Sequence, residues 1–148
     1  MTVRLSEEAF NHMRQMARTY GLSNRAMFET ATKECLDIPD RIARGELGPL
    51  HRRIHEAAWE VARRIDEETR TGEAQARRRV GFRLEAPLVD RLRNACSEFG
   101  VSMNSRLAVV VAPWGPDWGG SRHVATRTKM WEEIVAEARR VTGLRRYG

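Results

Sequence analysis

The fold is decided by residues 79–111, which read RVGFRLEAPLVDRLRNACSEFGVSMNSRLAVVV. Apolar and polar residues alternate over 80–84, which is the period of a strand with one buried face. Pro87 suits the first turn of a helix, and apolar side chains follow it at helical spacing: Val89, Leu92, Cys96 and Phe99. Gly100 then favours a left-handed helix end, and Ser102 the N-cap of a second helix. The stretch predicts strand, helix, turn and helix, a unit too small to close a core alone.

A second copy of this pattern lies near the N-terminus, 79 positions earlier in the chain. It begins with a short strand at Thr2–Leu5, continues with a helix over about 7–19 and starts a second helix at Asn24. The matching positions include Arg4 and Arg83, Leu5 and Leu84, Gly21 and Gly100, and Ser23 and Ser102. We expect Asp37–Asp40, which contains Pro39, to break the second helix. Pairing of the two strands predicts a mainly α fold with one short two-stranded antiparallel β-ribbon.

The rest of the chain adds helices to these two units. The predicted segments are a first unit over 1–37, a connector over 38–78, a second unit over 79–113 and a C-terminal segment over 114–148. Apolar residues of the connector recur at helical spacing, which predicts a helix over about 50–68. The C-terminal segment combines a Trp-rich loop, a last amphipathic helix and a basic tail.

Composition limits the classes of protein to consider. The 148 residues carry a formal net charge of +6, which permits a polyanionic partner. No apolar run approaches the length of a membrane span and no secretory signal is evident, so we expect a cytoplasmic protein without a membrane partner. Cys35 and Cys96 occupy unmatched positions of the two units, which favours two buried thiols over a disulfide.

The sequence contains no catalytic or metal-binding motif. There is no phosphate-binding loop, nucleophile elbow or Cys-x-x-Cys pair, so we expect neither an enzyme nor a cofactor. His51 and His55 have the i, i+4 spacing of a ligand pair, but no carboxylate or cysteine at ligand spacing accompanies them. Arg52 and Arg53 beside them would also repel a cation, so no metal site is predicted.

The predicted ribbon is the feature with functional chemistry. A two-stranded ribbon is narrow enough to enter the major groove of DNA, where arginine pairs with guanine and threonine can contact thymine. The residues predicted to contact bases from its outer face are Thr2, Arg4, Arg79, Gly81 and Arg83. The predicted phosphate contacts lie where the second helix of each unit begins, at Ser23, Asn24, Ser102, Met103 and Asn104. The expected partner is therefore double-stranded DNA.

This arrangement resembles the ribbon-helix-helix family of DNA-binding proteins, the Arc/MetJ superfamily. The resemblance rests on GFRLEAPLVDRLRNACSEFGVSMNS at 81–105 and, more weakly, on VRLSEEAFNHMRQMARTYGLSNRA at 3–26. It covers less than half of the chain, and the first unit departs from it at Asn24–Ala26. Most members form the ribbon from two chains, whereas both halves here lie in one chain, as in the TraY-like accessory proteins of conjugative relaxosomes. The resemblance implies an intramolecular pseudo-dimer with a connector helix and a C-terminal helix.

Several roles fit these features. A DNA-binding protein of this kind could be a transcriptional or plasmid regulator, or a relaxosome accessory factor that marks a transfer origin and meets a relaxase. The alternative is an antitoxin-like or other protein-interaction module whose Trp-rich C-terminal region binds a toxin-like partner. A third interpretation is a helical structural protein in which the ribbon is an ordinary strand pairing. The chain is expected to act as a monomeric pseudo-dimer, and further assembly on DNA stays open.

Overall fold

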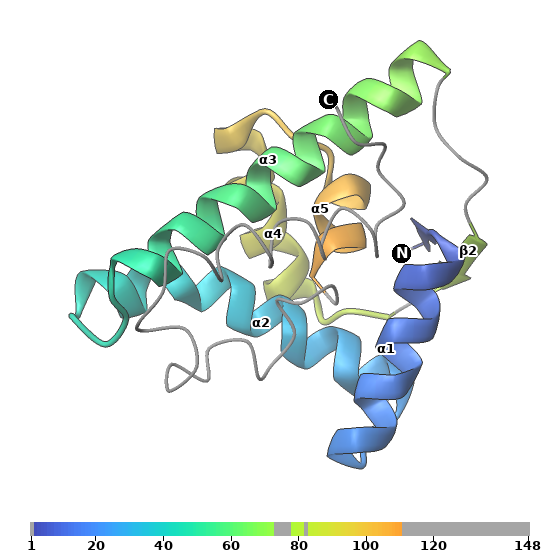
Figure 1. The fold of residues 1–148 in the computed structure, drawn as a ribbon, viewed down its shortest axis with the longest axis horizontal. Helices are drawn as coiled ribbons and strands as arrows, with labels where there is room; N and C mark the ends of the chain where they lie inside the picture. Colours follow the sequence, from blue (N-terminus) through green and yellow to red (C-terminus); the bar gives the residue numbers. More distant parts are fainter. Residues whose placement is uncertain (1, 73–77, 82, 111–148) are drawn as a thin grey trace.

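The computed structural model describes residues 2–72, 78–81 and 83–110, which form a mainly helical structure with one short antiparallel sheet. The elements are, in order, β1 (Thr2–Leu5), α1 (Glu7–Tyr20), α2 (Asn24–Ala43), α3 (Pro49–Thr71), β2 (Arg78–Gly81), α4 (Ala86–Phe99) and α5 (Met103–Val109). The ribbon of β1 and β2 lies at one end of the molecule, and the turn between α2 and α3 lies at the other end (Figure 1). The coarse fold class predicted from the sequence is therefore correct.

The two strand–helix–helix segments have the same local structure at positions 79 residues apart. Helices α1 and α4 both have 14 residues, and both end at a left-handed glycine with φ 67°, Gly21 and Gly100. Ser23 and Ser102 then cap α2 and α5 in the same way, each accepting the N–H of the residue three positions later at 3.1 Å. An L side chain is strained at such a φ, so each glycine permits the tight turn that places a serine at the next helix start.

Burial follows the same correspondence. Equivalent buried positions of the two long first helices are Ala9 and Leu88, Met13 and Leu92, and Ala17 and Cys96. Tyr20 and Phe99, predicted to close the apolar stripes, are instead 39% and 40% exposed at equivalent helix ends. The buried stripe thus follows an i, i+4, i+8 row of each helix. It includes the predicted Met13 and Ala17, and Leu92 and Cys96, but begins one position before the predicted Phe10 and Val89.

The two strands pair antiparallel in one register. Thr2 pairs with Gly81, Val3 with Val80, Arg4 with Arg79 and Leu5 with Arg78. Val3 and Leu5 are fully buried, whereas Arg4, between them, is exposed, so the ribbon has one face on the core and one face in solvent. The second strand was predicted at 80–84 but lies at Arg78–Gly81, since pairing with β1 decides its limits.

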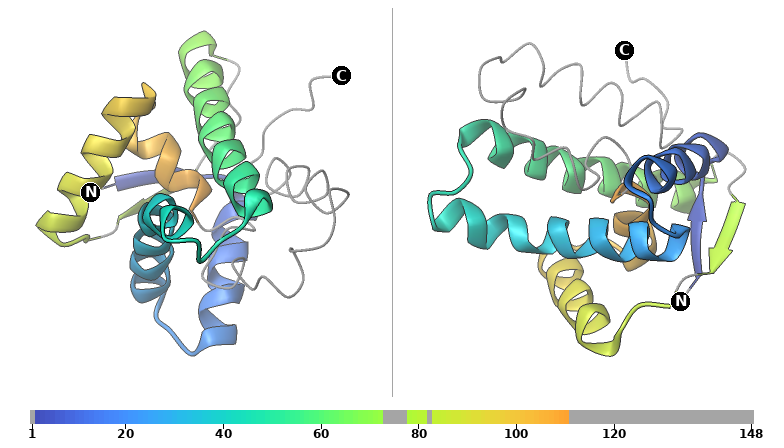
Figure 2. Two further views of the ribbon diagram at one scale, coloured as in Figure 1. Left: turned by 90° about the vertical axis from the view of Figure 1, so that its left-hand side faces the viewer. Right: turned by 90° about the horizontal axis from the view of Figure 1, so that it is seen from below.

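Helix α5 is enclosed by the other elements. Residues 105–110 are all buried, and α5 packs along α3, β1 and α4 (Figure 2). The connector helix α3 contributes one apolar stripe to this core, which includes Ala58, Val61, Ala62 and Ile65. The predicted connector helix over 50–68 is therefore confirmed, with three more residues at its C-terminal end. Packing of α3 against α5 places connector side chains beside the second unit.

The predicted break of the second helix at Asp37–Asp40 is wrong, because α2 continues through Pro39 to Ala43. The apolar row of α2 extends past the proline, with Cys35 and Ile38 both buried. Burial of that row offsets the loss of one backbone hydrogen bond at Pro39, which in a helix interior costs about 3 kcal/mol. In addition, Asp37 forms an ion pair with Arg91 of α4 at 2.7 Å, which ties this part of α2 to the second unit.

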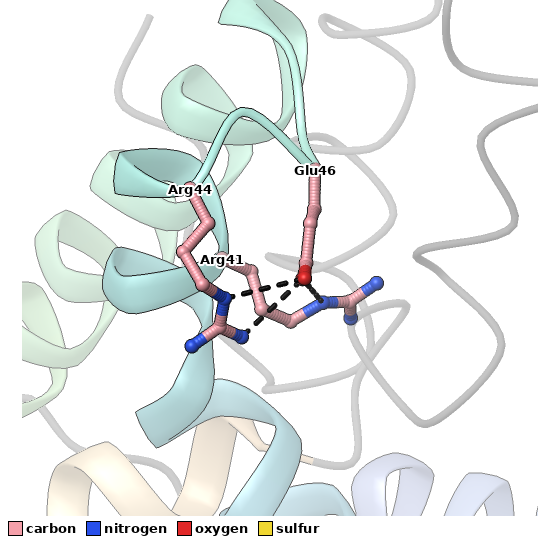
Figure 3. A network of polar contacts seen from close by, with 3 residues as sticks. All are labelled: Arg41, Arg44 and Glu46. Atoms are coloured by element: carbon pink, nitrogen blue, oxygen red, sulfur yellow. Dashed lines mark hydrogen bonds and ion pairs between the residues drawn. The ribbon is translucent and has the colours of Figure 1, made fainter.

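The turn between α2 and α3 is held by a small ionic network (Figure 3). Glu46 accepts hydrogen bonds from Arg44 at 3.2 and 3.3 Å and from Arg41 at 3.4 Å. Arg44 and Arg41 stabilise the charged carboxylate and so lower the pKa of Glu46 below its usual value. Arg44 and Glu46 are exposed and Arg41 is partly exposed, so this network fixes the turn without adding much to stability. It lies far from the ribbon (Figure 1).

The predicted Trp-rich loop, last helix and basic tail lie at 114–148, outside the described residues. The same holds for Phe82, which was predicted to face the core from the second strand. Leu84, predicted on the same face, is half-buried and packs against the core.

Candidate nucleic-acid interface

The solvent face of the ribbon carries a pair of arginines directly opposite each other. Arg4 of β1 pairs in register with Arg79 of β2, and both side chains are exposed. Thr2 and Gly81 form the neighbouring pair on this face, since residues two positions apart in a strand lie on the same side. Arg83, also exposed, follows β2 and precedes α4. Four of the five predicted base-contacting residues therefore lie in the paired ribbon, and Arg83 lies just beyond it.

The solvent face of the ribbon has an unusual distribution of charge. None of the ion pairs formed within 2–72, 78–81 and 83–110 involves Arg4, Arg79 or Arg83. Like charges directly opposite each other in a sheet destabilise it by a few tenths to about 1 kcal/mol. Folding alone does not favour two like charges that face each other without an ion-pair partner. The face is suited to an anionic partner that can neutralise both guanidinium groups.

The ribbon is attached to the second unit through α5. The backbone N–H of Arg4 donates to Oδ1 of Asn104 at 2.9 Å. Asn104 was predicted to contact phosphate, but its side-chain oxygen is engaged in this internal bond. This bond holds the outer edge of β1 at Arg4, which is one of the two opposed arginines. Met103, another predicted phosphate contact, is half-buried and packs against the core.

The first serine turn, Gly21–Ser23, is open to solvent. Ser23 and Asn24 are exposed, and the Ser23 hydroxyl accepts the N–H of Ala26. Arg25, the next residue along, is also exposed. The predicted phosphate contacts of the first unit therefore lie on an accessible surface with a cation beside them.

The second serine turn, Gly100–Ser102, differs because a carboxylate binds it. The backbone N–H of Ser102 donates to Oδ2 of Asp66 at 2.8 Å. The hydroxyl groups of Ser102 and Ser105 donate to Oδ1 of Asp66 at 2.6 and 2.5 Å. Asp66 lies on the connector helix α3, at an open groove that Arg63 and Arg70 also line. Sequence reasoning missed Asp66, because a polar residue next to a buried isoleucine is ordinary on an amphipathic helix and gives no sign of a specific contact.

A buried polar cluster lies behind this turn. Arg106 of α5 is 2% exposed, and its guanidinium stands 4.7 Å from the centre of the Trp59 ring. Trp59 stacks on Phe99 at 4.2 Å on a near-parallel plane and donates from Nε1 to Nε2 of His55 at 3.3 Å. Burial, and secondarily the charge of Arg106, lower the pKa of His55 to about 4. The cluster fixes α3 against α4 and α5 and keeps His55 neutral.

The two cysteines are free and buried, as predicted. Burial raises the pKa of both thiols, to about 11 for Cys96, and the nearby charge of Arg106 offsets this only in part. A thiol whose pKa is raised by burial has little thiolate at neutral pH, and is therefore unreactive.

Metal sites and membrane-spanning helices are two further features that bear on function. Within it, no group of three or more His, Cys, Asp or Glu side chains is arranged to hold a metal ion. No helix there has both the length and the apolar character that a membrane span requires. Comparisons with protein-family models, with curated proteins and with solved structures found no match to this chain. The geometry of the ribbon is therefore the feature that bears most directly on function.

Proposed function

We propose that this protein binds double-stranded DNA sequence-specifically by inserting the β1–β2 ribbon into the major groove. The observation that carries the proposal is the exposed Arg4–Arg79 pair, without an ion-pair partner among the described residues, on a ribbon whose other face is buried. The major groove admits a two-stranded ribbon, and arginine bonded to O6 and N7 of guanine is the commonest base-specific contact. A basic face without catalytic groups fits binding better than catalysis.

An intramolecular pseudo-dimer of two ribbon-helix-helix units is the architecture we propose for this activity. Positions related by the 79-residue offset include Thr2 and Gly81, and these two residues are paired in the ribbon. An approximate twofold axis that relates the two units would pass through this pair. By the same offset β1 corresponds to residues 81–84, of which β2 includes only Gly81. The equal lengths of α1 and α4 and the matched glycine ends and serine caps support the same relationship.

We further propose that the protein acts in the cytoplasm, as a transcriptional or plasmid regulator or as an accessory factor at a transfer origin. Both roles need the same ribbon, so their difference lies in the DNA target and in any protein partner. The antitoxin-like alternative depends on the Trp-rich segment at 114–148, and no contact within the described residues favours it.

Selection of bound duplexes from a random pool tests the proposed function. A chain with two unlike strands should recover a motif with unequal halves, because the bases would meet Thr2 and Arg4 on one strand and Arg79 and Gly81 on the other. Binding of the recovered duplex is then compared with binding of a scrambled duplex at several salt concentrations. Absence of duplex binding even at low salt, or equal affinity for both duplexes, contradicts the proposal.

A further inference from the structure

The second serine turn holds an anion that belongs to the chain itself. The carboxylate of Asp66 accepts three hydrogen bonds there, from the backbone and hydroxyl of Ser102 and from the hydroxyl of Ser105, at 2.5–2.8 Å. A DNA phosphate at a helix start would use the same kind of donors, namely backbone N–H and serine hydroxyl groups. Asp66 therefore occupies the hydrogen-bond donors that a phosphate would need.

The first serine turn has the same backbone but no such anion. Ser23 matches Ser102 in its capping bond, while Ala26 occupies the position of Ser105 and offers no hydroxyl. Within the described residues, no carboxylate contacts Ser23. Its neighbour Arg25 is a cation, whereas the equivalent residue of the second unit, Asn104, is neutral and bonded to the N–H of Arg4. The two units therefore differ in both charge and donor availability at matched positions.

We propose that Asp66 stands in for a DNA phosphate at the second unit, so that the duplex is anchored through its backbone at the first unit and not at the second. This inference rests on the proposed DNA binding. A phosphate that approached the second turn would find its donors occupied and a like charge at contact distance, which raises the free energy of that contact. The connector helix thus makes a nearly symmetric pair of units bind unequally, and Asp66 determines which half of the target is held more weakly.

The matched pair Asp66→Asn and Glu67→Gln tests this inference. Each substitution removes one negative charge from adjacent residues of α3. Glu67 is exposed and lines the same groove, but the carboxylate that accepts the hydrogen bonds of Ser102 and Ser105 is that of Asp66. Asparagine keeps an acceptor oxygen for the serine hydroxyls, and thermal unfolding checks that the fold is retained. We expect Asp66→Asn to bind the selected duplex about five-fold more tightly than Glu67→Gln, with the gain confined to one half-site in phosphate-ethylation interference. Equal affinities of the two variants, or no new interference signal, overturn the inference.

A second pair covers the case in which Asp66→Asn fails to fold. Asn24 at the first turn and Asn94 on α4 are both exposed, so Asn24→Asp and Asn94→Asp add the same charge at tolerated positions. We expect Asn24→Asp to weaken duplex binding about ten-fold and Asn94→Asp to change it less than about two-fold. Equal effects of these two variants contradict anchoring at the first unit. The proposed function would fail differently, because the wild-type chain itself would then not distinguish its selected duplex from a scrambled one.

Discussion

Arg4 and Arg79 lie directly opposite each other across the antiparallel ribbon, both exposed, and neither forms an ion pair within the described residues. The buried side of the same ribbon has the opposite character, since Val3 and Leu5 are completely enclosed. Folding explains the apolar face but not the charged one, because opposed like charges weaken a strand pair. The arginine pair is therefore the place where stability and the proposed function make opposite demands.

These opposite demands give the first prediction. Arg4→Ala and Arg79→Ala should each raise the free energy of unfolding by a few tenths to about 1 kcal/mol, since each removes the repulsion. Each should also weaken binding of the selected duplex by roughly 1–3 kcal/mol while leaving binding of a scrambled duplex less affected. Urea denaturation and fluorescence anisotropy measure the two quantities.

The control for the arginine pair is Arg93→Ala. Arg93 is exposed on α4 and pairs with Asp90 at 3.0 Å, so its loss removes the same charge away from the ribbon. The double variant of Arg4 and Arg79 should lose less binding energy than the two single losses added, because residues in contact with one ligand are coupled. If Arg93→Ala lowers sequence preference as much as the ribbon variants do, the ribbon is not the contacting surface.

The second prediction concerns Pro39. Alanine at this position restores an N–H for the carbonyl of Cys35 in the middle of α2, so Pro39→Ala should stabilise the fold by about 1–3 kcal/mol. Pro87→Ala is the matched control, since Pro87 lies in the first turn of α4, where proline is tolerated, and its loss should change stability by less than about 1 kcal/mol. Thermal unfolding compares the two. A destabilised Pro39→Ala protein would mean that the proline shapes α2 for its contact between Asp37 and Arg91.

Local sequence predicts the features that short-range interactions determine, and it misses those that tertiary packing determines. Capping residues act over a few positions, so Gly21, Gly100 and Ser102 marked helix boundaries that the structure reproduces. The limits of β2 depend on where β1 lies, and the chain pattern alone placed them about two residues late. Pro39 was given its usual meaning as a helix breaker, because the burial of Ile38 beyond it is a tertiary effect.

The candidate interface was predictable to a similar extent. Arg4 and Arg79 could be assigned to one face by alternation alone, whereas their direct opposition depends on the register of the ribbon. Asp66 could not be found, because it lies 36 positions from Ser102 and only the packing of α3 on α5 brings them together. Sequence reasoning predicted phosphate contacts at both serine turns and noted only that the first departs from the family pattern at Asn24–Ala26. The carboxylate that distinguishes the two turns comes from the connector.

A third prediction follows from the buried cation in α5. Arg106 is 2% exposed, and Met27 is fully buried at the position 79 residues earlier. No ion pair of the described residues includes Arg106, and its Nη1 atom has no hydrogen-bond partner there. A buried charge costs several kcal/mol in lost hydration, and its cation–π contact with Trp59 returns about 2 kcal/mol. Arg106→Met should therefore raise the free energy of unfolding by about 1–2 kcal/mol.

Arg106→Ala separates charge from volume in that experiment. It removes the same charge but leaves a cavity, so it should be less stable than Arg106→Met by about 2–5 kcal/mol. Urea denaturation of both variants is the measurement. A methionine variant that loses more than about 2 kcal/mol would mean that contacts such as the hydrogen bond with Cys35 compensate the guanidinium, and the interpretation of Arg106 as a destabilising buried cation would be wrong.

The fourth prediction is a pH dependence that originates at His55. Burial and the charge of Arg106 lower its pKa from 6.5 to about 4, so between these values the unfolded chain binds more protons than the folded chain. Stability should therefore rise with pH across this window and fall by up to about 3 kcal/mol as the pH drops through it. His55→Gln keeps an acceptor for the Trp59 N–H and should remove this part of the slope. Urea denaturation at a series of pH values compares the two proteins, and equal slopes for wild type and His55→Gln would show that His55 is not held neutral by the fold.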